Sequence, residues 1–202
     1  DTKRLKDIVR RSIMTSSFFI FPMMLGLAVV SEPLIKIILT EKWLPSVPFM
    51  QIYCMSYMFM PIHTSNLQVL NAMGRSDIFL KLEVLKKVIG ILILVVSMQI
   101  SIYAIALGAL ISNIIFSFIN AFPNKRMLDY TYKEQISDVL PSLIVSLIMA
   151  SIVHIIGYIE LATWKVLTIQ VIMGIFIYFY LSKLMKLESF NYIEMTIRQF
   201  NK

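Results

Sequence analysis

Residues Val88–Asn124 read VIGILILVVSMQISIYAIALGALISNIIFSFINAFPN and contain no Lys, Arg, Asp or Glu. A helix needs roughly 20 apolar residues to cross the hydrocarbon core of a bilayer, so this run is too long for one crossing. The polar stretch Ser97–Ser101 lies in its middle and can supply a turn. The run therefore predicts two membrane-spanning helices, near residues 79–98 and 102–122.

Four other runs without charged residues flank this one, at Ser12–Ser31, Trp43–Gly74, Val139–Ile159 and Val166–Ser182. Each fits one crossing, and the predicted spans lie near residues 13–30, 46–70, 139–158 and 164–182. The runs are continuously apolar rather than alternating, and a segment in lipid must satisfy its own backbone hydrogen bonds, which favours helices over barrel strands. We therefore predict an all-α integral membrane protein, with about six transmembrane helices in residues 1–183 and a cytoplasmic tail at residues 184–202.

The composition agrees with this fold class. Apolar residues make up 58% of the chain and charged residues 15%, against about 45–50% and about 25% in a typical globular domain. A water-soluble domain this apolar would lack a polar surface, so the excess must face lipid.

The basic residues predict how the chain is oriented in the membrane. Of the 19 Lys and Arg residues, all but Lys36, Lys42 and Lys165 fall on one side of the predicted spans. The positive-inside rule places that side, with both chain ends, in the cytoplasm. Because the basic residues cluster at span ends, the net charge of +7 indicates contact with anionic lipid headgroups rather than with nucleic acid.

Several connections and kinks are also expected. Ser31–Trp43 is too short and too charged to span, and we predict a short helix along the outer interface. Asn71–Asp77 predicts an inner turn, because Gly74 favours the left-handed conformation that ends helices. Pro22 and Pro61 lie well inside predicted spans and should kink them, whereas Pro141 suits the first turn of the fifth span.

Polar side chains inside two spans are the candidate functional residues. In the fourth span Asn113, Ser117 and Asn120 share one helix face, which either packs against another helix or lines a water-filled cavity. In the second span His63 and Asn66 share a face, and such polar groups are costly when they face lipid, so they either line a cavity or lie near the inner interface, where water can satisfy them. We therefore predict a substrate cavity with candidate residues His63, Asn66, Asn113, Ser117 and Asn120.

Basic residues near the third span have two interpretations. Lys86 and Lys87 could extend toward the inner headgroups, as long basic side chains near span ends commonly do. Alternatively Arg75, Lys86 and Lys87 attract the phosphorylated headgroup of a substrate, and they are our candidates for that role.

No feature of the sequence indicates an enzyme. It contains no Gly-rich phosphate loop, no zinc-ligand spacing and no pair of carboxylates within a span. Cys54 is the only cysteine, which excludes a disulfide within the chain. We predict no cofactor and no metal site.

In their order and spacing, several short blocks resemble bacterial polysaccharide flippases of the Wzx type. These proteins belong to the superfamily of multidrug, oligosaccharidyl-lipid and polysaccharide exporters. The blocks are Pro22–Leu27, Glu32–Ile35, Glu41–Ser46, Asn71–Asp77, Lys81–Glu83, Lys86–Lys87 and Asp138–Pro141. The resemblance covers about residues 5–150, and one departure is that Thr40–Trp43 lacks a Gly often found before the Trp of this loop.

The resemblance implies a transporter of two helical lobes in the bacterial inner membrane, with this chain as most of the C-terminal lobe. It implies that an N-terminal lobe precedes Asp1 and that the substrate is a polyprenyl-pyrophosphate-linked oligosaccharide. Such a flippase exports units for lipopolysaccharide, O-antigen or capsule by alternating access. The alternatives are a multidrug or small-molecule exporter of the same superfamily, and a non-transporting membrane component of polysaccharide assembly.

Overall fold

The computed structural model describes the backbone of residues 2–200 and the side chains of residues 2–196. Over this range the chain is helical and contains no strand, which confirms the predicted all-α class. The helices are α1 (Thr2–Val29), α2 (Ser31–Ile38), the short 3₁₀ helix η1 (Glu41–Ser46), α3 (Val47–Tyr57), α4 (Met60–Ala72), α5 (Ser76–Met98), α6 (Ile102–Leu128), α7 (Tyr132–Ile156), α8 (Thr163–Leu184) and α9 (Glu188–Phe200).

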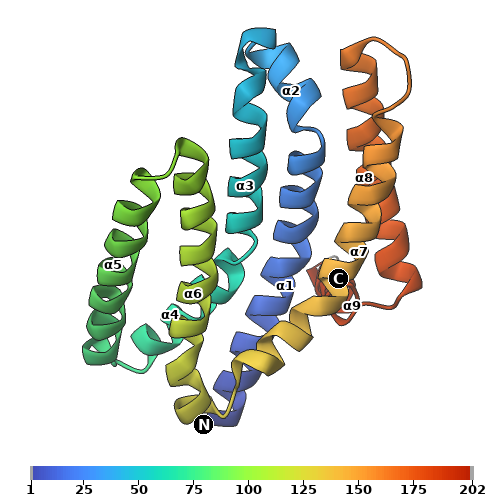
Figure 1. The fold of residues 1–202 in the computed structure, drawn as a ribbon. Coiled ribbons are helices and arrows are strands. Elements are labelled where there is room, and N and C mark those ends of the chain that lie inside the picture. The colour runs from blue at the N-terminus through green and yellow to red at the C-terminus, as the bar shows by residue number, and fades with distance from the viewer. Residues whose placement is uncertain (1, 201–202) are drawn as a thin grey trace.

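The long helix α1 occupies the middle of the bundle (Figure 1). Helix α7 packs against one side of α1, and α8 packs against α7. Helices α3 and α4 pack against the other side of α1, α6 packs against α3 and α4, and α5 packs against α6. Two buried apolar clusters hold this arrangement. One, around Ile13, Ile62 and Leu128, joins α1 to α4 and α6, and the other, around Phe18 and Val145, joins α1 to α7 and α8.

The turns alternate between the two ends of the bundle. The start of α1, the α4–α5 turn and the α6–α7 turn lie at one end, with the N-terminus at the bottom of Figure 1. We call this the basic end, because its turns and the helix ends beside them carry Lys3, Arg4, Lys6, Arg75, Lys125, Arg126 and Lys133. The other end, with α2, η1 and the α7–α8 turn, is the α2 end. The charge asymmetry predicted from sequence therefore coincides with one end of the bundle.

Four of the described helices are long and apolar enough to cross a membrane, namely α1, α6, α7 and α8. The second predicted span, 46–70, forms two helices that are interrupted at Met58 and Phe59. Pro61 stands in the first turn of α4, where its missing N–H costs no helical hydrogen bond. The third predicted span, 79–98, falls within α5, whose first half carries four charges between Lys81 and Lys87. The count of about six spans remains a prediction.

Two helices begin well before the spans predicted within them. Helix α1 begins at Thr2, ahead of the predicted span near 13–30, and continues through Pro22. Helix α7 begins at Tyr132, where Thr131 and Glu134 form a capping box. Pro141 therefore lies inside α7, and its predicted place in a first turn was wrong. Both helices extend past the apolar run because ion pairs between them stabilise their polar N-terminal segments, and the capping box adds to this in α7.

The predicted interfacial segment and the predicted tail both contain helices. Ser31–Trp43 forms the predicted short helix, α2, and then enters η1. The predicted tail at 184–202 contains α9, and Leu187 and Phe190 pack it against the cluster around Phe18. Residue 1 of the predicted lobe and residues 201–202 of the tail lie outside the described residues.

A glycine sets the close approach of α5 and α6. A Cβ added at Gly108 would lie 2.5 Å from Ser97 Oγ and 3.1 Å from Ile93 Cγ2. We expect Gly108→Ala to lower the free energy of unfolding by about 1–3 kcal/mol, because overpacking forces neighbours out of place. Chemical denaturation followed by circular dichroism measures this. Ser97→Ala should recover part of the loss, and Gly26→Ala is the control because its Cβ would meet nothing within 4 Å. Equal stability of the Gly108 and Gly26 variants would contradict the expectation.

Candidate functional site

Three amide side chains meet between α4, α6 and α7. Asn66 Nδ2 donates to Gln135 Oε1 at 2.7 Å, and Gln135 Nε2 donates back to Asn66 Oδ1 at 3.0 Å. Asn124 Nδ2 donates to the same Asn66 oxygen. All three side chains are fully buried. We call Asn66, Asn124 and Gln135 the amide cluster.

The amide cluster satisfies Asn66 completely. Its second N–H donates to the Ile62 carbonyl at 2.7 Å, one turn back on α4. A buried amide is costly unless its hydrogen bonds are made, so this arrangement fixes the mutual rotation of three helices. Sequence reasoning predicted Asn66 but missed Asn124 and Gln135, because both lie beyond the predicted spans. The spacing of Asn120 and Asn124, one helical turn apart, was a signal that the polar row of α6 continues.

Next to the amide cluster, His63 on α4 pairs with Asn120 on α6. Asn120 Nδ2 and His63 Nδ1 are 3.0 Å apart, and when the amide is the donor, the neutral imidazole carries its proton on Nε2. His63 Nε2 and Asn120 Oδ1 are both buried and have no hydrogen-bond partner among the described residues. The backbone of Asn113 lies beside the His63 ring. This pair therefore leaves the Asn120 oxygen as an acceptor for a bound group, with the His63 ring held between Asn120 and the Asn113 backbone.

Lys86 of α5 lies close enough to His63 to interact with it electrostatically. Its ammonium contacts Glu83 Oε1 at 2.5 Å, and its side chain is only 11% exposed. A pocket of about 320 Å³ opens beside this pair, between α5 and α6, and is lined by Glu83, Lys86, Lys87, Gly90 and Phe116 among others. The lysine thus brings a positive charge, partly balanced by Glu83, to the half-buried region around His63.

The structure separates Ser117 and Arg75 from this region. Ser117 donates to the Ile114 carbonyl at 2.7 Å, and its hydroxyl lies 2.9 Å from that of Tyr132, so it joins α6 to the start of α7. Arg75 is exposed at the α4–α5 turn and bonds Asp77 at 3.0 and 3.2 Å. Lys87 is exposed on α5 and lines the same pocket as Lys86. The predicted residues that lie together are His63, Asn113, Asn120 and Lys86. Among the described residues, no three His, Cys, Asp or Glu side chains are placed to hold a metal ion.

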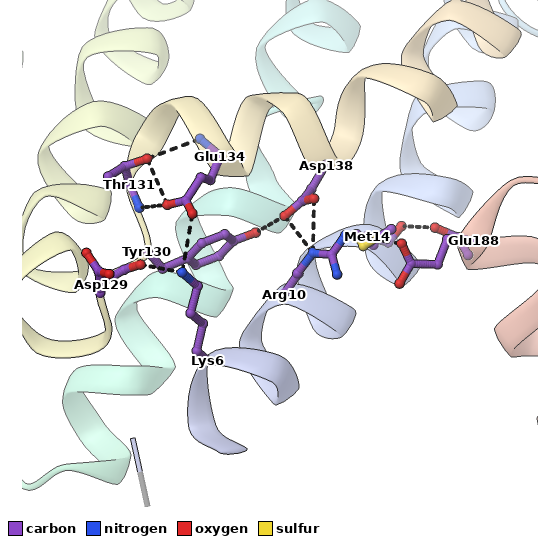
Figure 2. A network of polar contacts seen from close by, with 10 residues as sticks. Lys6, Arg10, Met14, Asp129, Tyr130, Thr131, Glu134, Asp138 and Glu188 are labelled. Atoms are coloured by element: carbon purple, nitrogen blue, oxygen red, sulfur yellow. Dashed lines mark hydrogen bonds and ion pairs between the residues drawn. The ribbon is translucent and has the colours of Figure 1, made fainter. Parts of the chain in front are cut away.

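An ion-pair network that sequence reasoning missed joins α1, α7 and α9 (Figure 2). Arg10 Nε contacts both carboxylate oxygens of Asp138 at 3.0 Å, and its Nη2 contacts Glu188 at 3.1 Å. One turn earlier on both long helices, Lys6 contacts Glu134 at 3.3 Å. The equal four-residue spacing of Lys6 with Arg10 and of Glu134 with Asp138 was the available signal.

Tyr130, in the α6–α7 turn, completes this network. Its hydroxyl donates to Asp138 Oδ2 at 2.8 Å, and its ring lies under the Lys6 ammonium, 5.5 Å from ring centre to Nζ. Burial raises the pKa of the Tyr130 phenol, and its hydrogen bond to Asp138 raises it further. The phenol therefore stays protonated and keeps donating to Asp138.

The comparisons with known proteins agree on one class of protein. Residues 1–48 match a family described as "Polysaccharide biosynthesis protein". Over 155 residues the chain is 28% identical to the lipopolysaccharide biosynthesis protein WzxC of Escherichia coli (strain K12). The match covers 72% of this chain and 32% of WzxC, so the chain spans about a third of that relative's length. No solved structure gives a significant match.

The match to WzxC covers more of the chain than the family match over residues 1–48, and the chain forms an all-helical bundle with four apolar helices of membrane-spanning length. Both comparisons name polysaccharide biosynthesis. The predicted resemblance to Wzx-type polysaccharide biosynthesis and transport proteins is therefore confirmed.

Proposed function

We propose that this chain forms part of a membrane flippase that exports polyprenyl-pyrophosphate-linked oligosaccharide units for lipopolysaccharide, O-antigen or capsule. The observation that carries the proposal is the similarity to WzxC over 155 residues of an apolar helical chain. A bundle of this kind, with a polar region enclosed by apolar helices, suits transport by alternating access around a site within the membrane. We place it in the bacterial inner membrane, with both ends of this chain in the cytoplasm.

His63, Asn113, Asn120 and Lys86 would form this lobe's part of the cavity wall. The Lys86 ammonium and the His63 ring beside it suit the oxygens of a pyrophosphate, which only accepts hydrogen bonds when ionised. The free Asn120 oxygen suits a sugar hydroxyl. Arg75 and Lys87, both exposed on or near the basic end, would attract the anionic headgroup from the cytoplasmic leaflet.

Asn66 and Ser117 would not contact the substrate but would hold the helices that form this wall in position. The amide cluster fixes α4 against α6 and α7, and Ser117 ties α6 to Tyr132. The interruption at Met58 and Phe59 would let α3 and α4 change their mutual angle while α4 stays fixed. A second lobe, supplied by another part of the same protein, would close the cavity from the other side.

Replacing Asn113 and Asn120 by leucine in the full-length protein is expected to abolish export. Loss of two polar side chains from the wall and of the His63 partner should lower transport at least about tenfold, the effect of roughly 1.4 kcal/mol. Surface polysaccharide and retained lipid-linked oligosaccharide are measured in cells that depend on the protein. Ile114→Leu, on the exposed side of α6, is the matched control. Unchanged export at normal protein levels would refute the assignment of this face.

A further inference from the structure

An apolar slot separates α1 from α8 on the side of the bundle away from α5. Helices α1 and α8 both pack on α7 and meet where the Tyr178 hydroxyl donates to the Phe18 carbonyl at 2.6 Å, so α7 forms the floor of the slot. The cavity volume is about 330 Å³, and its lining includes Met23, Gly26, Leu27, Met149, Gly174 and Ile175. Its walls are almost entirely hydrocarbon, which suits an alkyl chain.

Two glycines shape this slot. A Cβ added at Gly174 would meet Val153 Cγ2 at 3.3 Å and Met149 Sδ at 3.4 Å, so the bare glycine lets α8 lie close to α7. A Cβ added at Gly26 would meet nothing within 4 Å, so the glycine on α1 leaves the slot wide. A larger side chain at Gly26 therefore has room to fill the slot without disturbing the helices.

At the α2 end the apolar slot adjoins a polar pocket of about 310 Å³. This pocket is lined by Glu32 and Lys36 of α2, by His154 and Tyr158, and by Gln170 of α8. Glu32 and Lys36 form an ion pair at 3.2 Å and place a negative and a positive group side by side. Gln170 lines both cavities and thus lies at their junction.

Gln170 has an unpaired acceptor at this junction. The side chain is 3% exposed, and its Nε2 donates to the Val153 carbonyl at 3.0 Å, which fixes the orientation of the amide. Its Oε1 is buried and has no hydrogen-bond partner among the described residues. Buried acceptors are nearly always paired in folded proteins, so the position calls for a hydrogen-bond donor from a bound molecule.

We propose that the slot and the polar pocket together bind one phospholipid with a zwitterionic, ammonium-bearing headgroup. One acyl chain fills the slot, the ammonium donates to Gln170 Oε1 and lies beside the Glu32 carboxylate, and the phosphate lies beside Lys36. An anionic lipid without an ammonium supplies no charged donor to Gln170 and no headgroup cation to the Glu32 carboxylate. This site is separate from the proposed cavity around His63 and does not depend on the transport proposal.

The test measures lipid retention by the purified full-length protein with native mass spectrometry. The probes are phosphatidylethanolamine and phosphatidylglycerol with identical acyl chains. We expect phosphatidylethanolamine to be retained about tenfold more strongly, as one charged hydrogen bond and one ion contact predict. Gln170→Leu should abolish the preference between the lipids, and Gly26→Leu should reduce retention of both by filling the slot.

Two controls and a competitor make this test decisive. Gln68→Leu, on the exposed side of α4, and Val95→Leu, on the exposed side of α5, should leave retention unchanged. Equal retention of the two lipids by the unmodified protein would overturn the proposal, as would normal retention by Gly26→Leu. Polyprenyl phosphate could instead displace the bound phospholipid from the unmodified protein but not from Gly26→Leu. That result would assign the slot to an isoprenoid chain and would also overturn the proposal.

Discussion

Replacing Arg10 by leucine is expected to lower the free energy of unfolding by about 2–3 kcal/mol. Arg10 is the common partner of Asp138 and Glu188, and its loss leaves the Asp138 carboxylate, which is only 15% exposed, without a counter-ion. Breaking a fully buried pair costs roughly 3–5 kcal/mol, and the expected value is smaller because the Arg10 side chain is 38% exposed.

Chemical denaturation of the full-length protein in detergent, followed by circular dichroism, measures the Arg10 effect. Arg75→Leu is the matched control, because the side chains of Arg75 and Asp77 are each about half exposed. Exposed ion pairs contribute about 0–1 kcal/mol to the free energy of unfolding. Adding Asp138→Leu to Arg10→Leu removes the stranded charge and should restore most of the stability. A loss no larger than that of Arg75→Leu would show that the network around Arg10 does not stabilise the fold.

The same substitution should loosen α9. Glu188, at the first residue of α9, contacts α1 through Arg10, and Ser189 donates to the Met14 carbonyl at 3.3 Å. Without Arg10 we expect faster proteolysis in the turn before α9, at Met185–Leu187, while cleavage elsewhere stays unchanged. Uniform acceleration at all sites would instead indicate global unfolding.

Replacing Asn66 by leucine should lower the free energy of unfolding by about 2–4 kcal/mol. The change removes the acceptor of Asn124 and of Gln135 and the donor to Gln135 Oε1, so several buried polar groups lose partners at once. Each buried group left unpaired costs about 1–3 kcal/mol, and partial rearrangement reduces the sum. The same denaturation experiment measures it.

Gln68→Leu is the control for Asn66→Leu, since it changes an exposed amide on the same helix. We expect that variant to stay within about 0.5 kcal/mol of the unmodified protein. Replacing Asn66, Asn124 and Gln135 together by leucine should cost less than Asn66→Leu alone, because no partner is then stranded. Similar stability of the two single variants would contradict the inferred role of the amide cluster.

The sequence predicted the helical class and the centres of the long helices, but not their ends. Apolar runs mark where a helix can lie in lipid, and they located α6 and α8 well. They could not locate the starts of α1 and α7, because the polar N-terminal segments of both helices are stabilised by contacts among Lys6, Arg10, Glu134 and Asp138. Those contacts join residues more than 120 positions apart in the chain.

The candidate site was predictable in its residue types but not in its pairing. A polar face on α6 and polar groups on α4 were visible from helical periodicity, and the structure pairs His63 with Asn120. Periodicity does not show which helices face one another. Asn66 and Ser117 were therefore assigned to the same predicted cavity, whereas the structure pairs them with Gln135 and Tyr132 of α7. Gln135 was missed because it lies seven residues after Leu128, beyond the α6–α7 turn.

The most direct test of the proposed function is to delete the full-length gene and measure where lipid-linked oligosaccharide accumulates. We predict loss of surface polysaccharide and accumulation of complete lipid-linked units on the cytoplasmic side of the inner membrane, both reversed by re-expression of the unmodified gene. Normal surface polysaccharide with no such accumulation would contradict the account, and increased sensitivity to small toxic compounds in the same cells would point to a drug exporter instead.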